Sequence, residues 1–362
     1  MTKLQLVTFL IQTQIGVGFL SLPYGIHKFA KGDSWISLLL TGLGMEVLAI
    51  FYLILCNRFP KQHLFQILQS ILGKVLGKCL TLFYAFYFLL TGSTILILFV
   101  YIIKKWMLIY TPYWVVLILM CSIGIYIAVE NLKVIARFYF IATFVLFVFI
   151  LIVPIAFKDG NIHYIMPIGH SGILNIIKGA SHATFAWQGM EMFLIVSPFV
   201  MATEKERIKA VTLSNLFITL FYSFLTFVCL IYFSNDEMML IPEPVLYLLK
   251  SFTFKIIERP DLIIISLWII LVGTSFISYL YGASLAGTFL IKKLNRKSFV
   301  YLSAIICFTF ALFFYNQKAI EKLTQITTYV GFIFLMAVPI SLLIISLLFR
   351  KRQKGVFNAN NN

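Results

Sequence analysis

The sequence predicts an all-α polytopic membrane protein with ten transmembrane helices, arranged as a 5+5 inverted repeat in which helices 1 and 6 are broken. Hydrophobic residues make up 61% of the chain and charged residues only 12%, whereas soluble domains carry about 25% charged residues. Apolar runs of about 20 residues recur with short polar gaps, which is the pattern of membrane-spanning helices. Two of these runs are interrupted by glycine, polar residues and proline, and each opens a set of five.

No linker or shift in composition divides the chain, so we expect a single transmembrane domain over residues 1–354. The first repeat, about residues 5–157, contains the predicted spans Gln5–His27, Trp35–Cys56, Cys79–Ile103, Tyr113–Val129 and Val134–Phe157. The second repeat, about residues 180–349, contains Ala180–Val200, Val211–Phe233, Leu262–Leu290, Phe299–Tyr315 and Ile326–Phe349. Residues 355–362 are polar and are expected to form a disordered cytoplasmic tail.

Two further segments have an apolar face but lack the length of a span. Between the second and third spans, one face is formed by Leu64, Ile67, Leu68, Ile71, Leu72 and Val75. This pattern predicts an amphipathic helix that lies in the cytoplasmic membrane interface. On the outer side, Pro244–Ile257 would either cover the outer mouth of a site or pack on the loop of the first repeat.

The net charge of +16 is distributed as in a membrane protein. With the N-terminus in the cytoplasm, 18 Lys and Arg residues fall on the inner side and 11 on the outer side. This asymmetry satisfies the positive-inside rule and places both termini in the cytoplasm. The basic residues therefore indicate topology and contact with membrane lipid, and we expect no nucleic-acid partner.

The break in the first span predicts a ligand site at mid-membrane. Gly16 and Gly18 allow the backbone to open, and Pro23 leaves a carbonyl one turn earlier without a donor. Free amides at the N-terminus of a half-helix attract a carboxylate, and free carbonyls attract an ammonium group or a cation. An amino acid carries both charges. The alternative is that these glycines only allow close packing of helices.

The break in the sixth span adds polar side chains to this site. Glu191 lies in an apolar run, where it would meet a ligand's amino group, exchange a proton, or bond to unwound amides. Thr184 and Gln188 supply neutral donors and acceptors, and Trp187 supplies an aromatic wall. The run closes at Pro198.

Five other residues are candidates for coupling to an ion or for structural roles. Glu46 in the second span is either a proton relay or a hydrogen-bonded link between helices, and we favour the link. Thr274, Ser275 and Ser278 in the eighth span could complete a sodium-like site, although such hydroxyls commonly bond to their own helix. Arg137 could replace sodium electrostatically, but extension toward the interface explains it better.

Nothing in the sequence indicates an enzyme, a cofactor or a metal site. The segment Gly73–Cys79 is one residue short of a phosphate-binding loop. The five cysteines and the outer histidines lack the spacing of metal ligands.

The two broken segments resemble motifs of a known superfamily. Gly16–Pro23 is similar to the first-helix motif of the amino acid–polyamine–organocation transporters, and Phe185–Glu191 to their sixth-helix motif. The resemblance implies a leucine-transporter-like fold. The length of ten helices, together with the wording of both motifs, is most similar to that of the B subunit of bacterial spore germinant receptors.

This likeness implies a subunit of the spore inner membrane beside a larger A subunit and a C-subunit lipoprotein. It implies that binding of a small nutrient such as an amino acid triggers germination. By the same likeness Gly16, Gly18 and Ser21 would contact the ligand's carboxylate. The amino group and side chain would be met by Thr184, Gln188, Gly189 and Glu191. The alternative function is a proton- or sodium-coupled amino acid permease.

Overall fold

The computed structural model describes residues 1–252, 259–314 and 316–353, and these residues form helices and connecting turns with no β-strand. The α-helices are α1 (Lys3–Gln14), α2 (Leu22–Ala30), α3 (Ser34–Arg58), α4 (Leu64–Leu72), α5 (Lys74–Trp106), α6 (Tyr113–Ala128), α7 (Leu132–Ala142), α8 (Phe144–Ile152), α9 (Ile173–Ala183), α10 (Met192–Val196), α11 (Glu204–Tyr232), α12 (Asn235–Leu240), α13 (Pro244–Ser251), α14 (Pro260–Leu290), α15 (Arg296–Leu312), α16 (Gln317–Phe332) and α17 (Val338–Leu348). Three shorter turns matter below, the 3-10 helices η1 (Gly18–Leu20) and η5 (Thr184–Trp187) and the π-helix η7 (Ile333–Ala337).

Six helical runs of the described chain are long and apolar enough to cross a membrane. They are Leu22–Arg58, Lys74–Trp106, Leu132–Lys158, Glu204–Tyr232, Pro260–Leu290 and Gln317–Leu348. A span needs about 20 residues, so α6 with 16 residues and α15 with 17 fall below this length, as do α1, α9 and α10 of the broken helices, whereas α2 forms part of the run Leu22–Arg58. The chain is an integral membrane protein, because runs of this length and hydropathy are stable only in lipid.

Several predicted boundaries shift. The amphipathic helix between the second and third spans is α4, but it ends at Leu72, because Gly73 has a φ of 85°. Val75 therefore belongs to α5, where its side chain is exposed, and α5 begins at Lys74 and not at Cys79. A glycine tolerates this positive φ at no steric cost, which explains why the apolar pattern did not reveal the helix end.

Parts of three predicted segments lie outside the described residues. These parts are the end of the outer amphipathic segment, residue 315 at the end of the ninth predicted span, and the tail at 355–362. The described part of the outer segment forms α13, whose buried side chains pack against α2, α14 and η1. Its first turn is held by an ion pair of 2.7 Å between Glu243 and Lys105 of α5. Helix α13 therefore covers the broken part of the first helix.

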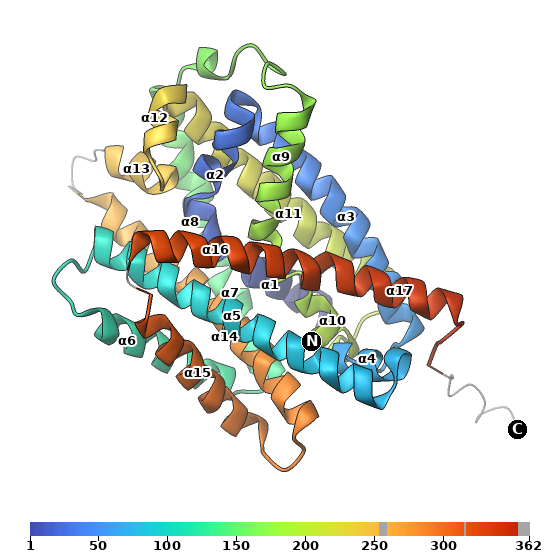
Figure 1. Cartoon of the computed structure of the whole chain (residues 1–362). Coiled ribbons are helices and arrows are strands. Elements are labelled where there is room, and N and C mark those ends of the chain that lie inside the picture. Colours follow the sequence, from blue (N-terminus) through green and yellow to red (C-terminus); the bar gives the residue numbers. More distant parts are fainter. Residues whose placement is uncertain (253–258, 315, 354–362) are drawn as a thin grey trace, which may run out of the picture.

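Helix α1 lies in the middle of the molecule, against α7, α11 and α14 (Figure 1). The most extensive contacts join α5 to α14 and α3 to α11. Helices α16 and α17, joined through η7, form one long rod that crosses in front of α5 (Figure 1). The two broken helices are thus enclosed by continuous ones.

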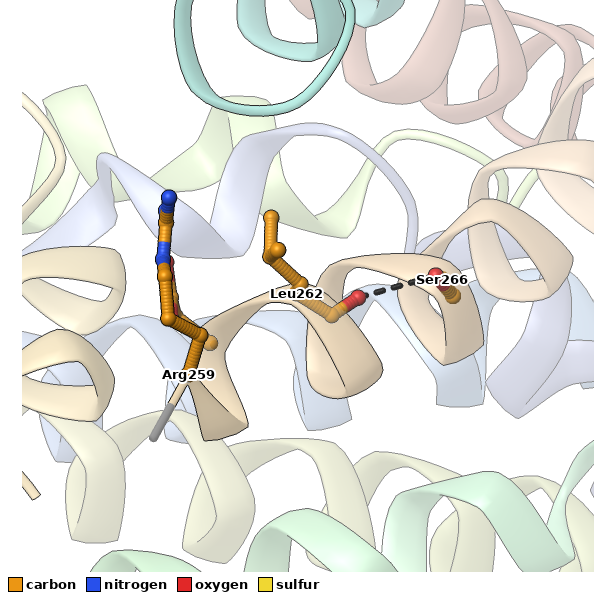
Figure 2. A network of polar contacts seen from close by, with 4 residues as sticks. Arg259, Leu262 and Ser266 are labelled. Atoms are coloured by element: carbon orange, nitrogen blue, oxygen red, sulfur yellow. Dashed lines mark hydrogen bonds and ion pairs between the residues drawn. The ribbon is translucent and has the colours of Figure 1, made fainter. Parts of the chain in front are cut away.

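Helix α14, with 31 residues, is the longest helix that packs against α1. At its start Arg259 pairs with the buried Asp261 at 2.8 Å. One turn further on, the Ser266 hydroxyl donates to the Leu262 carbonyl at 2.8 Å (Figure 2). Such a bond satisfies a hydroxyl inside an apolar helix without any partner from another element. Helix α14 then continues unbroken to Leu290.

Candidate functional site

The first helix is interrupted where the glycines predicted it. Helix α1 ends at Gln14, residues 15–17 are irregular, and the helix resumes through η1 into α2 at Leu22. Within the described chain, the backbone N–H groups of Gly16, Val17 and Gly18 donate no hydrogen bond. The break therefore presents three free donors where the chain leads into η1 and α2, at the positive, N-terminal end of the second half-helix.

The sixth predicted span is interrupted as well. Helix α9 ends at Ala183, η5 and an irregular turn follow, and α10 begins at Met192. Gly189 in this turn has a φ of 110°, and a Cβ there would lie 2.5 Å from the Thr13 carbonyl oxygen. The Thr13 hydroxyl also donates to the Gly189 carbonyl at 3.3 Å. The two breaks therefore touch, and only glycine fits at this point.

A cavity of about 30 Å³ lies between the two breaks. Its lining comes from both breaks and from α5 and α14, namely Thr13, Gln14, Gly16, Val17, Gly18, Thr91, Ile95, Phe185, Ala186, Gln188, Ser275 and Tyr279. Pockets that enclose drug-sized ligands measure roughly 300–1,000 Å³, so this cavity has room for water and not for such a ligand. Any organic ligand requires the helices to move apart.

Two lining side chains carry oxygens that lack a partner. The Oε1 atoms of Gln14 and Gln188 are buried without a hydrogen bond in the described chain. Their nitrogens donate to backbone carbonyls, Gln14 to Leu10 at 2.8 Å and Gln188 to Thr327 at 3.2 Å. A carbonyl accepts but does not donate, so each amide must turn its nitrogen to that carbonyl and leave its oxygen free. A buried acceptor left without a donor costs about 1–3 kcal/mol.

The cavity therefore has donors on one side and acceptors on the other. Backbone N–H groups of the Gly16–Gly18 segment can bind an anion, while the oxygens of Gln14 and Gln188 can accept from an ammonium group. A small zwitterion supplies both partners. No formal charge of the protein is needed for this recognition.

Glu191 lies behind this lining. It is fully buried, and it accepts from the Tyr87 hydroxyl at 2.7 Å, the Tyr279 hydroxyl at 3.4 Å and the Gly189 N–H at 2.9 Å. The ion pairs found in the described chain are Lys105–Glu243 and Arg259–Asp261, so Glu191 has no cation partner there. Of the three roles considered for Glu191, the bond to an unwound amide is present in the geometry. Tyr279 connects it to the cavity.

Glu46 links α3 to α11. Its carboxyl accepts from the Thr212 hydroxyl at 2.6 Å and from the Asn215 amide at 2.8 Å. Asn215 also accepts from the Trp187 indole N–H at 3.0 Å, which turns Trp187 away from the cavity and toward α11. The aromatic side of the cavity is formed by Phe185 and Tyr279 instead.

The other predicted site residues lie around the cavity or apart from it. Ser21 is exposed beyond η1, and the Thr184 hydroxyl donates to the Ser181 carbonyl at 2.7 Å. Arg137 is exposed on α7. Among the hydroxyls of α14, Ser275 lines the cavity, whereas Thr274 and Ser278 bond to other elements behind it.

Sequence reasoning missed Gln14, whose free oxygen is a main feature of the site. A signal was available, because the polar run Gln12–Gln14 directly precedes the glycines in an apolar helix. The described residues contain no group of three or more His, Cys, Asp or Glu side chains that could hold a metal ion.

Comparisons with known proteins agree with this architecture. The sequence profile of a family described as "Spore germination protein" matches residues 1–320. The chain is 29% identical to spore germination protein GerQB of Bacillus cereus over 336 residues, 91% of each chain. It is 26% identical to spore germination protein YndE of Bacillus subtilis over 349 residues, 95% of this chain and 96% of the relative. It is 28% identical to spore germination protein A2 of Bacillus subtilis over 349 residues, 92% of each.

Among solved structures, the fold is similar to that of Mhp1, a nucleobase-cation-symport-1 family transporter, in a closed conformation with bromovinylhydantoin bound. The TM-score is 0.69 at 10% sequence identity, over 98% of this chain and 80% of the transporter. At this identity the likeness shows a shared fold.

Proposed function

Because the chain belongs to the spore germination protein family, we propose that it is the B subunit of a spore germinant receptor that binds a small nutrient, an amino acid, at mid-membrane. Binding shifts the subunit between two conformations, and partner subunits respond to that shift. The partners are a larger A subunit and a C-subunit lipoprotein in the spore inner membrane. Both termini of the chain lie in the cytoplasm.

The proposal includes a single transmembrane domain over residues 1–354, with ten spans in two inverted repeats. Three features support it. Helices 1 and 6 of this scheme are both broken, and they meet at Gly189. The most extensive contacts, α3 with α11 and α5 with α14, pair the second span with the seventh and the third with the eighth. The third feature is the fold that this chain shares with the transporter Mhp1.

One observation carries the choice of an amino acid. Three free backbone donors at Gly16–Gly18 stand near the two free acceptor oxygens of Gln14 and Gln188. The carboxylate of the ligand binds at Gly16 and Gly18, and its ammonium group binds at Gln14 and Gln188. Ser21 and Thr184 lie nearby and contact the ligand when the site opens.

Reconstitution of the full chain in proteoliposomes tests this function. Binding and uptake are measured in parallel for a labelled panel of the proteinogenic amino acids. We expect saturable binding without accumulation, and a loss of affinity of at least tenfold in Gln14→Leu and Gln188→Leu, because each loses a charge-assisted hydrogen bond. Gln325→Leu, at an exposed position of α16, serves as the matched control. No binding by any amino acid would reject the proposal.

A second candidate is a proton- or sodium-coupled amino acid permease. The fold shared with a cation symporter favours it. It predicts accumulation of the amino acid against its gradient by this chain alone, which the same proteoliposomes would reveal.

A further inference from the structure

A second polar cluster lies where α1 crosses α7 and α14, and it centres on the fully buried Gln12. The Gln12 side-chain nitrogen donates to the Thr143 hydroxyl at 3.2 Å. Its side-chain oxygen accepts from the Thr274 hydroxyl at 2.8 Å. Its backbone carbonyl is 3.2 Å from the Ser275 hydroxyl, which donates to it. One residue of α1 thus contacts α14 and the residue that links α7 to α8 through the two ends of its amide.

The other oxygens of this crossing are also engaged. The Tyr139 hydroxyl bonds to the Thr274 carbonyl at 2.5 Å and lies 2.7 Å from the Ser278 hydroxyl. The Thr143 hydroxyl donates to the Tyr139 carbonyl at 2.8 Å. These carbonyls and hydroxyls are the kind of oxygen ligands that hold sodium between helices in transporters of broken-helix folds. Here they bond to each other and to Gln12.

The cluster contains no carboxylate to balance a cation. Helices α1, α7 and α8 have no Asp or Glu, and their charged residues are Lys3, Lys133 and Arg137. The one acidic residue of α14, Asp261, pairs with Arg259 in the first turn. Glu191 of the second break accepts from Tyr87, Tyr279 and Gly189, and no hydrogen bond of the cluster reaches it. A buried cation without a counter-charge is costly.

The Gln12 side-chain amide also places an N–H donor among these oxygens, where it donates to the Thr143 hydroxyl. An N–H group carries positive partial charge, so it repels a cation that approaches the same oxygens. The residues present therefore do not fit a sodium ion.

We propose that the Gln12 side-chain amide takes the place of a coupling cation at the crossing of α1, α7 and α14, so that ligand binding by this chain is independent of sodium. The statement that ligand binding is independent of sodium rests on the proposed function, whereas the statement that Gln12 takes the place of a cation does not. The link between α1 and α14 is made of hydrogen bonds within the chain, and movement of α1 breaks and remakes these bonds without release of an ion.

The first experiment needs no ligand. The melting temperature of the purified full chain is compared in NaCl, KCl and choline chloride at equal ionic strength, about 0.15 M. An ion that binds the folded state raises its stability, so we expect equal melting temperatures within about 1 °C. A specific increase in sodium overturns the proposal. If an amino acid binds, its affinity is measured in the same salts, and a tenfold gain in sodium also overturns it.

A variant tests whether Gln12 itself excludes the ion. Gln12→Glu places a carboxylate at the crossing, and at pH 8.5 we expect sodium to raise its melting temperature by about 2 °C or more relative to choline. Gln325→Glu adds the same charge at an exposed position of α16 and should show no sodium effect. Indifference of Gln12→Glu to sodium counts against the proposal.

If Gln12→Glu does not elute as a folded protein, Gln12→Asp replaces it. This shorter side chain also supplies a carboxylate beside the oxygens of Thr274, Ser275 and Thr143 at the crossing. Sodium-dependent melting of Gln12→Asp supports the proposal, and its absence rejects it. If no amino acid binds but the melting temperature is the same in all salts, the receptor function is rejected and the role of Gln12 is not.

Discussion

A carboxyl group buried at membrane depth requires donors, and Glu191 obtains them from the protein. Its oxygens receive two phenol hydroxyls and one backbone N–H, and the last of these belongs to the strained turn at Gly189. The side chain therefore holds the irregular backbone of the second break in place. Its cost of burial is offset by these three bonds and not by an ion pair.

We expect Glu191→Gln to destabilise the protein by about 1–3 kcal/mol, because an amide presents a donor where Glu191 now has a second acceptor. Either the Tyr87 hydroxyl or the Gly189 N–H then lacks its acceptor. Thermal unfolding in detergent measures the effect. Glu130→Gln, at an exposed position, is the matched control, and equal melting of both variants would show that the carboxyl is dispensable for the turn.

The histidine that precedes α4 gives the structure a pH dependence outside the spans. Burial lowers the pKa of His63 from its usual 6.5 to about 4. The neutral form is favoured in the folded state, so the stabilisation is complete above pH 6.5 and is lost as the pH falls toward 4. The loss is about 1.4 kcal/mol for each pH unit.

We therefore expect the melting temperature to fall between pH 7 and pH 5 in the wild type and to fall less in His63→Gln. His163→Gln, at an exposed position, should follow the wild type. An identical pH profile for His63→Gln and the wild type would contradict this role of His63.

At the scale of elements, the contact between α3 and α11 is set by one small residue. A Cβ at Gly42 would overlap the Thr219 side chain of α11, while a Cβ at Gly44 would meet no atom within 4 Å. The Gly42 carbonyl also accepts from the Asn215 amide at 3.0 Å. Close approach of the two backbones brings Asn215 within reach of Glu46. Small residues commonly have this role between membrane helices.

The two glycines form a matched pair for mutation. We expect Gly42→Ala to cost roughly 1–3 kcal/mol, because the added methyl group forces α3 and α11 apart. Gly44→Ala should be neutral or stabilising by about 0.5 kcal/mol, because alanine restricts the unfolded chain. Thermal unfolding of both variants checks this, and a larger loss at Gly44 would contradict the packing described.

At the scale of the whole molecule, the helices leave little room between the two breaks. The cavity of about 30 Å³ must enlarge before an amino acid can enter. On the α13 side, the halves of the two broken helices, α2 and α9, pack together, and a Cβ at Gly179 of α9 would lie 3.1 Å from the Ala30 Cβ of α2. The separation of α2 from α9 is the movement that would open the cavity.

A disulfide between these helices tests the movement. The double variant Ala30→Cys with Gly179→Cys, in a chain whose exposed Cys79 is replaced by Ser, should bind its amino acid at least tenfold more slowly when oxidised. The Cβ separation of 3.1 Å is a few tenths of an ångström shorter than in native disulfides, about 3.5–4.5 Å, and a Cβ at residue 179 would lie 2.7 Å from the Ser37 Oγ, so α2 and α9 must shift slightly to form the bond. Reductant should restore binding, and each single-cysteine variant serves as control. Unchanged binding after oxidation would mean that the ligand enters elsewhere.

The sequence by itself determined the class of the protein and the places where its helices break. A run of about 20 apolar residues becomes a membrane helix whatever its neighbours are, and glycine or proline within it acts on the local backbone. For this reason the breaks at Gly16 and Gly189 and the α4 helix were predictable from local pattern. The end of α4 was not, because the positive φ of Gly73 leaves no mark on the apolar period.

Only the tertiary structure decided which polar side chains meet. Gln188 is oriented by a carbonyl of α16, Trp187 is turned outward by Asn215 of α11, and Gln12 bonds to α14 across more than 250 positions of the chain. Each of these partners lies on another helix, so no local pattern contains it. The free oxygens of Gln14 and Gln188 and the free N–H groups of Gly16–Gly18 belong to two segments far apart in the chain, and only the folded structure brings them together around one cavity.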